Sequence, residues 1–277
     1  MSFNIKITII SYISFSILLF SCEIDTEIGH DYSLPNKNYI MIHGFITGRD
    51  IEIFVNKSFP PEKIIQDDAI ISCNVKLFEN GVHLFDLDKK NSNLFKSPKY
   101  FTPRLNSTYH IVVNTDRLGK ATSAEQKVHS PVKIDTIYKT KIQDNENLIN
   151  IVFKFQDPKG EKNYYYPRVY VYPPDENESS FFKEKFYGSY AFDDKFTDGQ
   201  CITKHFEKIY IYQKDSIKVE LISLSEDLYL FLESKHENYH SLGNSFTNQP
   251  IPVYTNIKNG YGIFGSFTVD SMYMYLK

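Results

Sequence analysis

The sequence predicts a mainly β protein with one α-helix late in the chain. Phenylalanine and tyrosine are abundant, at 22 and 21 residues, whereas tryptophan is absent. Aromatic and β-branched side chains favour strands over helices. Short segments in which apolar and polar residues alternate recur along the chain, and turn-forming residues separate them. This pattern is typical of strands that each bury one face, so we expect sheets to form most of the fold.

Residues 38–131 are predicted to form an immunoglobulin-like β-sandwich. Near the start of this segment, two strand-like pieces are separated by the polar residues 47–50. Farther along, two alternating runs flank Asn80 and Gly81. An Asn-Gly pair between such runs is a strong signal of a tight hairpin. Several short strands joined by turns in a segment of this length are typical of a sandwich.

Residues 132–277 are predicted to form a second β-rich domain. Alternating runs again indicate strands, and two of them flank Lys214-Asp215 as a second expected hairpin. A helix is expected near residues 224–241. Ser223 and Glu226 have the spacing of a capping box, and apolar residues recur at helical spacing after them.

The N-terminus has the pattern of a bacterial lipoprotein signal peptide over residues 1–21. One cation, Lys6, precedes a stretch without charge that is shorter than the roughly 20 apolar residues needed to span a bilayer. The stretch ends in Leu19-Phe20-Ser21-Cys22, which we interpret as a lipobox. Signal peptidases need small residues beside the cut, and the thiol of Cys22 would carry the diacylglycerol. Cys22 is therefore the predicted lipidation site, with palmitate among its expected acyl chains.

Residues 22–37 show no periodicity and begin with several acidic residues, so we expect a flexible acidic tether. These acidic residues resemble the surface-export signals of Bacteroidota lipoproteins, and this resemblance implies the cell surface over the periplasmic face of the outer membrane. The whole chain carries 31 basic and 34 acidic side chains, a net charge of −3, which gives no electrostatic case for binding nucleic acid. An oxidising compartment would permit a disulfide between Cys73 and Cys201, but they lie far apart in the chain, so we favour two free buried thiols.

Several features occur in an order that resembles a family of Bacteroidota outer-membrane lipoproteins, the DUF4249 type, whose function is unknown. The resemblance covers nearly the whole mature chain, and its most specific part is a C-terminal passage with three glycines. The passages that carry it are Cys22, His43-Gly44, Asn80-Gly81, His129-Ser130-Pro131-Val132-Lys133-Ile134-Asp135, Tyr254-Thr255-Asn256-Ile257 and Gly260-Tyr261-Gly262-Ile263-Phe264-Gly265. We interpret the glycine passage as turn geometry that needs positive φ angles, because it lacks the strand–turn–helix context of a nucleotide-binding loop.

The resemblance implies an accessory role beside TonB-dependent outer-membrane transporters. No catalytic residue is known for the family, so none is transferred to this chain. The predicted function is therefore a lipid-anchored outer-membrane accessory or binding protein that partners such a transporter in nutrient capture. We expect neither catalysis nor a cofactor nor a bound metal.

One motif supports a different hypothesis. His236, Glu237 and His240 fit the H-E-x-x-H pattern of zinc peptidases, in which two histidines bind Zn²⁺ and the glutamate activates water. A catalytic zinc needs a third protein ligand, and after His240 the chain contains no His or Glu and only one acidic residue, Asp270. The motif also falls at the end of the expected helix. We therefore favour two solvated histidines, and a surface zinc metallopeptidase remains the alternative.

A third hypothesis is a glycan-binding adhesin. The aromatic clusters Tyr164-Tyr165-Tyr166 and Phe181-Phe182 could stack on sugar rings, although core packing and strand propensity explain most such residues. The absence of tryptophan weakens this hypothesis. Asp193 and Asp194 could bind Ca²⁺ in a loop but match no known loop template, so we expect solvated surface residues.

Overall fold

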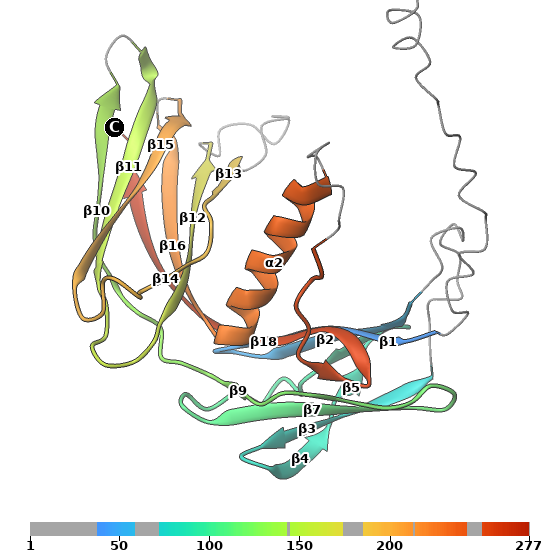
Figure 1. The fold of residues 1–277 in the computed structure, drawn as a ribbon. Helices are drawn as coiled ribbons and strands as arrows, with labels where there is room; N and C mark the ends of the chain where they lie inside the picture. The colour runs from blue at the N-terminus through green and yellow to red at the C-terminus, as the bar shows by residue number, and fades with distance from the viewer. Residues whose placement is uncertain are drawn as a thin grey trace, which may run out of the picture. The chain divides into compact units, whose positions relative to one another are not determined.

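The computed structural model describes residues 38–58, 72–142, 145–173, 185–212, 214–242 and 251–276. Within them the chain is mainly β, with several sheets and one helix late in the sequence, so the predicted fold class is confirmed (Figure 1). The helix is neither long nor apolar enough to cross a bilayer. The leader, Cys22, the acidic tether and Phe181-Phe182 lie outside the described residues.

The first β-sandwich consists of two sheets with a common core. Alternation determines which side of a strand faces that core: in β1, every second residue from Ile40 to Ile46 is buried. One of these is Gly44, where a side chain would crowd Phe264. One sheet contains β1 (Ile40–Thr47), β2 (Ile51–Lys57), β6 (Leu94–Lys96) and β5 (Asp88–Lys89). The other contains β17 (Ile257–Lys258), β8 (Gly119–Ser123), β7 (Thr108–Thr115), β3 (Cys73–Glu79), β4 (Val82–Asp86) and β9 (Gln126–Lys127).

The second β-sandwich has its own core, to which Phe153, Val169 and Val219 contribute. Its three-stranded sheet contains β10 (Ile134–Ile142), β11 (Asn145–Gln156) and β15 (Cys201–Tyr210). Facing it are β13 (Lys185–Gly188), β12 (Tyr164–Tyr172), β16 (Ser216–Leu224) and β14 (Phe192–Asp193).

One long strand, β18 (Gly260–Tyr275), belongs to both sandwiches. Its first half pairs in parallel with β1, and its second half pairs antiparallel with β16. Through β18, one sheet of each sandwich therefore joins the other in a single nine-stranded sheet. β17 and the first half of β18 belong to the first sandwich, so residues after 132 contribute to both sandwiches. The predicted domain boundary between residues 131 and 132 stays a prediction.

Two local expectations about the strands can be compared with the structure. The Asn80-Gly81 hairpin is confirmed: it joins β3 to β4, and both turn residues have positive φ angles, as a type I′ turn requires. The expected hairpin around Lys214-Asp215 is wrong. β15 and β16 lie in different sheets, so this segment crosses between the two layers of the sandwich.

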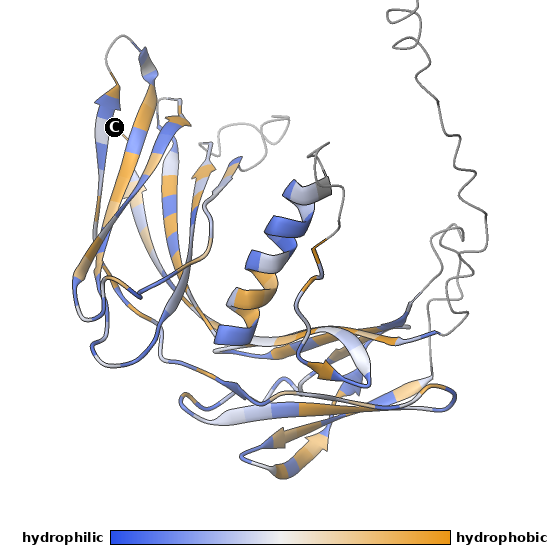
Figure 2. Cartoon of the chain, viewed as in Figure 1, coloured by the Kyte–Doolittle hydropathy of each residue, from blue (hydrophilic) through white to orange (hydrophobic). Residues whose placement is uncertain are grey.

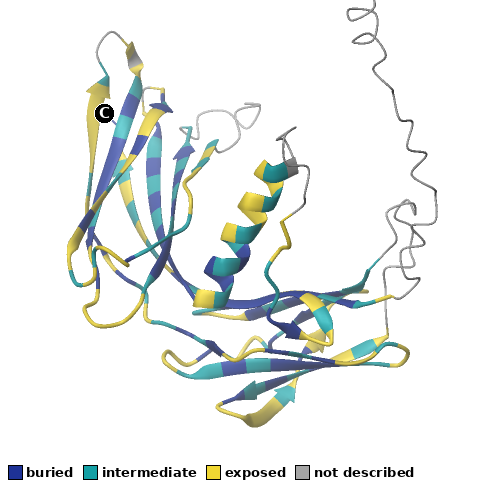
Figure 3. Ribbon diagram, in the orientation of Figure 1, coloured by how far each residue is buried: buried dark blue, intermediate teal, exposed yellow. Residues whose placement is uncertain are grey.

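Helix α2 (Glu226–Leu242) packs on the face of the nine-stranded sheet that is turned away from the second core. Figures 2 and 3 show that the helix starts with a hydrophilic, exposed end, continues with an apolar and largely buried part, and ends in turns that are mostly hydrophilic and exposed. The helix approaches the sheet closely at Gly265, where an added Cβ would lie 2.7 Å from the Cβ of Leu228. A glycine at this position thus allows the close packing.

The helix begins later than the capping pattern predicts. Ser223 lies at the end of β16, and its hydroxyl accepts a hydrogen bond from the backbone of Val132 at 3.4 Å. The carbonyl of Ser225 accepts the bond from the Tyr229 amide that opens the helix. Two acidic residues, Glu226 and Asp227, then occupy the first turn, where the helix dipole favours negative charge.

The two described cysteines are free, but neither is buried. Cys73 in the first sandwich is half-buried, and Cys201 at the start of β15 is exposed. The expectation of two buried thiols is therefore wrong, because Cys201 occupies the solvent-facing side of an edge strand.

Candidate functional site

Helix α2 and the sheet line two neighbouring, half-open cavities. Leu228, Leu232 and His236 follow one another at intervals of four residues and thus share one face of the helix. Leu228 and Leu232 line an inner cavity of about 240 Å³, whereas Leu232 and His236 line an outer one of about 410 Å³. Leu232 and Tyr166 border both cavities, so these spaces are adjacent.

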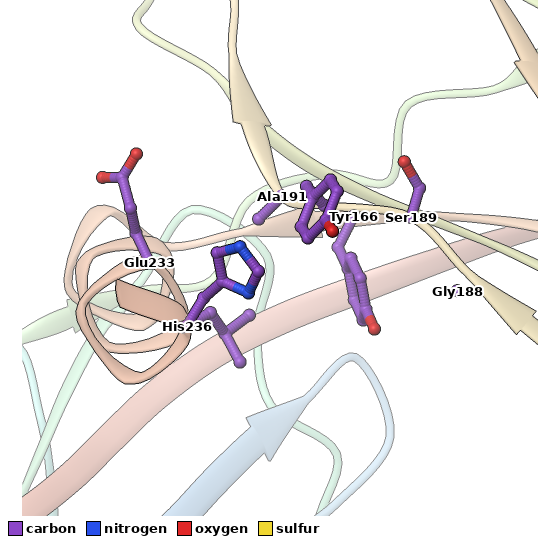
Figure 4. A pocket seen from close by; sticks show the side chains of 8 residues that line it. Tyr166, Gly188, Ser189, Ala191, Glu233 and His236 are labelled. Atoms are coloured by element: carbon purple, nitrogen blue, oxygen red, sulfur yellow. The ribbon is translucent and has the colours of Figure 1, made fainter. Parts of the chain in front are cut away.

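The outer cavity has a mainly apolar surface with some polar groups, among them Glu233 and His236 of the helix. Opposite the helix, its wall consists of Tyr166, of Gly188 at the end of β13, and of the chain that continues from there to Ala191. Figure 4 shows His236 projecting from the helix toward this wall. The ring centroid of His236 lies 4.5 Å from that of Tyr190. A cavity of this volume with convergent polar groups is the usual form of a small-molecule site.

The inner cavity is apolar apart from one cation. Arg168 on β12 is the only charged residue among the described residues that line it. The other lining residues are Phe45, Tyr166, Ile222, Leu224, Leu228, Leu232 and Phe267. Sequence reasoning missed this arrangement, because its members come from β1, β12, β16, β18 and α2 and no local pattern connects them.

The structure places the zinc-peptidase motif in the exposed last turns of α2. His236, Glu237 and His240 are all exposed. The rings of His236 and His240 lie edge to face, with centroids 4.2 Å apart. Within the described residues, only one group of three or more His, Cys, Asp or Glu side chains lies close enough to share a metal ion, and it does not include these histidines. The described part of the chain thus offers this pair no third ligand from those residue types.

That one group is an acidic cluster beside β12. Asp157, Asp194 and Asp198 bring carboxylate oxygens within 4.8 Å of one another. The expectation that Asp194 is solvated is wrong, because its side chain is buried. Burial raises the pKa of the Asp157 carboxyl, and hydrogen bonds from Tyr165 and Gly199 act in the opposite direction.

Each carboxylate of the acidic cluster already accepts hydrogen bonds from the protein. The Tyr165 hydroxyl donates to Asp157 at 2.5 Å. Backbone amides complete the arrangement: Gly199 donates to Asp157 at 2.8 Å, Asn163 to Asp194 at 3.0 Å, and Gly160 to Asp198 at 2.7 Å. Asp157 and Asp194 are buried and have such donors, whereas Asp198 is exposed, so we interpret the cluster as a satisfied connection between two loops.

The comparison with known proteins gives one family. A family model described as a domain of unknown function (DUF4249) matches residues 22–272, and the chain belongs to this family. Among curated proteins, none matches the chain.

Proposed function

We propose that this protein is a lipid-anchored outer-membrane accessory or binding protein that partners a TonB-dependent transporter in nutrient capture, without catalysis. The cell surface is the favoured face of the membrane. The observation that carries the proposal is the lipobox ending in Cys22. The family match begins at the same residue, so the leader lies outside the shared region, as expected for a peptide that is removed.

The fold and the cavities support a role in binding. Two β-sandwiches share the strand β18, and the half-open cavities beside α2 offer space for a ligand. The two histidines of the H-E-x-x-H motif are exposed. Among the described residues, no His, Cys, Asp or Glu side chain lies where it could join them as a third metal ligand. These observations favour binding over zinc-dependent hydrolysis.

The anchor can be tested directly. We expect Cys22→Ala to leave the protein unprocessed or soluble, because acyl chains contribute about 0.8 kcal/mol per buried CH₂ and two or three of them give stable anchoring. Membrane fractionation and mass spectrometry of the mature N-terminus measure the outcome. Cys201→Ala, which removes an exposed free thiol, is the matched control and should fractionate like the wild type. Normal membrane fractionation of Cys22→Ala would contradict the proposal.

The partner requires a separate experiment. Affinity purification of the wild-type protein from outer membranes, followed by mass spectrometry, should recover a TonB-dependent transporter. Recovery should fall for Cys22→Ala, since the anchor confines the protein to the same membrane. A monomer without any envelope partner would count against the transporter and leave the anchor unaffected.

Glycan binding is a second candidate, and one observation favours it. Beyond the helix, the outer face of the nine-stranded sheet exposes aromatic rings from three strands. Phe186 and Tyr273 are about half exposed, and Tyr170 lies between them in register. The ammonium group of Lys218 lies 5.6 Å from the ring centroid of Tyr170 and 5.9 Å from that of Tyr273. Flat aromatic faces beside polar groups suit the stacking of sugar rings.

A glycan array probed with the wild type and with Tyr273→Ala tests this candidate. If the aromatic face binds sugars, the substitution should weaken every signal at least several-fold. Tyr100→Ala is the matched control, because Tyr100 is a highly exposed tyrosine of the first sandwich. The absence of any signal, or equal signals for both variants, would count against glycan binding.

A further inference from the structure

Arg168 occupies an unusual position on β12. Its neighbours Pro167 and Val169 point into the second core, so Arg168 lies on the opposite face, which α2 covers in part. The residue directly across on β13 is Gly188, which has no side chain. The rings of Tyr166 and Phe186 lie beside Gly188. The guanidinium carbon of Arg168 lies 4.8 Å from the ring centroid of Tyr166 and 5.9 Å from that of Phe186.

The Arg168 charge is not balanced by a carboxylate. Glu220 stands directly across on β16, but its carboxylate pairs with the ammonium group of Lys218 at 2.5 Å. Within the described residues Arg168 forms no ion pair, and its buried Nε has no hydrogen-bond acceptor. Arg168 as a whole is partly buried, and aromatic faces stabilise a cation only modestly, so a guanidinium group partly withdrawn from water favours an oppositely charged partner.

The surroundings of Arg168 define what such a partner must be. The inner cavity has a volume of about 240 Å³, which limits the ligand to a small molecule. Its apolar wall, formed in part by Phe45, Leu228 and Phe267, excludes a fully hydrated ion and favours a hydrocarbon body. An anion beside Arg168 would be attracted strongly, because low-dielectric walls strengthen charge interactions.

We propose that this cavity binds a small amphiphilic anion, whose carboxylate or phosphate group pairs with Arg168 and whose apolar body packs against Phe45, Leu228 and Phe267. Arginine suits this role because its planar guanidinium group can donate two hydrogen bonds to one oxyanion. The inference rests on the proposed role as a binding protein and names the chemical class of its ligand. The adjoining outer cavity provides space for a longer body or a polar substituent.

Binding of 3-phenylpropionate to the detergent-purified protein, measured by titration calorimetry, tests the proposal. The alcohol 3-phenyl-1-propanol has the same body without the charge, and 3-phenylpropyl phosphate separates the two kinds of anion. We expect at least one anion to bind about tenfold or more tightly than the alcohol, the range expected for a charged hydrogen bond. Equal affinity of acid, phosphate and alcohol, or no binding of either anion, would overturn the proposal.

Variants show whether Arg168 provides the preference. Arg168→Gln should abolish the difference between anion and alcohol, and Arg168→Lys should retain part of it. Arg104→Gln is the matched control, because Arg104 is an exposed arginine of the first sandwich. Leu232→Trp should weaken all three probes by filling the space, which tests the site if Arg168→Gln does not fold. Undiminished anion preference in folded Arg168→Gln would overturn the assignment.

The outcome can be separated from that of the proposed function. Calorimetry uses the purified protein alone, whereas anchoring and transporter recovery are measured in membranes. If no anion binds but the wild type anchors normally and recovers the transporter, only the proposed ligand class is disproved. If anion binding fails and anchoring and transporter recovery fail as well, the proposed function is also disproved.

Discussion

Gly262→Ala is expected to prevent stable folding or to lower the free energy of unfolding by at least about 3 kcal/mol. Gly262 lies in β18 where this strand pairs in parallel with β1. Its φ angle is 113°, a value that L-residues rarely adopt. An added Cβ would also lie 1.9 Å from the carbonyl oxygen of Ile42, so the two strands would have to separate. Denaturant unfolding followed by circular dichroism measures the loss.

Gly81→Ala is the control that separates the two causes. Gly81 also has a positive φ angle, 80°, but an added Cβ there would meet nothing within 4 Å, so an alanine introduces backbone strain without a clash. We expect it to cost about 1–2 kcal/mol. If Gly262→Ala is no more destabilising than Gly81→Ala, then the close approach of β18 to β1 does not determine stability in the way we infer.

Local patterns predicted the elements well and their connections less well. The Asn80-Gly81 hairpin and the late helix follow from residues that are neighbours in sequence, so periodicity and turn chemistry suffice to find them. The crossing at Lys214-Asp215 looks like a hairpin from the sequence alone. Whether two consecutive strands pair or separate into two layers depends on the packing of the whole sandwich, which the flanking residues do not encode.

The pairing of β18 with β1 is the largest feature that the sequence did not reveal. Met41 pairs with Tyr261, a partner more than two hundred positions along the chain. No hydrophobic period connects such distant segments. The same limitation applies to the cavities: Arg168 stands in a tyrosine-rich strand where nothing marks it, and the residues around it come from distant elements.

The sequence motifs that attracted attention have structural explanations. The glycine passage of residues 260–265 was expected to form turns, yet it lies in β18. Gly262 allows β1 to approach, and Gly265 allows α2 to approach. Within this passage, Gly262 combines a positive φ angle with close contact, because a parallel neighbour occupies the space where a side chain would be. The passage that carries the family resemblance thus determines how the helix and the two sandwiches meet.

Asn256 forms the other half of this junction. Its side chain accepts a hydrogen bond from the Phe264 amide at 3.0 Å and donates one to the Phe264 carbonyl at 2.8 Å, as a neighbouring strand would. The same amide nitrogen donates to Asp227 in the first turn of α2 at 2.8 Å. Asp227 also accepts hydrogen bonds from Tyr254 at 2.5 Å and from Gln126 at 2.6 Å. One asparagine thereby connects β18, the helix and, through Asp227, the first sandwich.

Asn256→Ala is therefore expected to lower the free energy of unfolding by about 3–5 kcal/mol, because it leaves two backbone groups of buried Phe264 without partners and removes a donor to Asp227. Asn256→Asp keeps the acceptor for the Phe264 amide, but it replaces the donor by a carboxylate oxygen that faces Asp227. We expect it to be at least as destabilising at neutral pH, because like charges then lie together. Urea unfolding measures both variants.

Asn74→Ala is the matched control for the asparagine substitutions. Asn74 is exposed, and its amide reaches Asp86 only at 3.4 Å, so its loss should change the free energy of unfolding by no more than about 0.5 kcal/mol. Asp227→Ala combined with Asn256→Ala should cost less than the sum of the two single changes, since the variants share one hydrogen bond. If Asn256→Ala instead changes the free energy of unfolding as little as Asn74→Ala does, then the packing of α2 on the sheet stabilises the junction. The hydrogen bonds around Asp227 would then contribute little to stability.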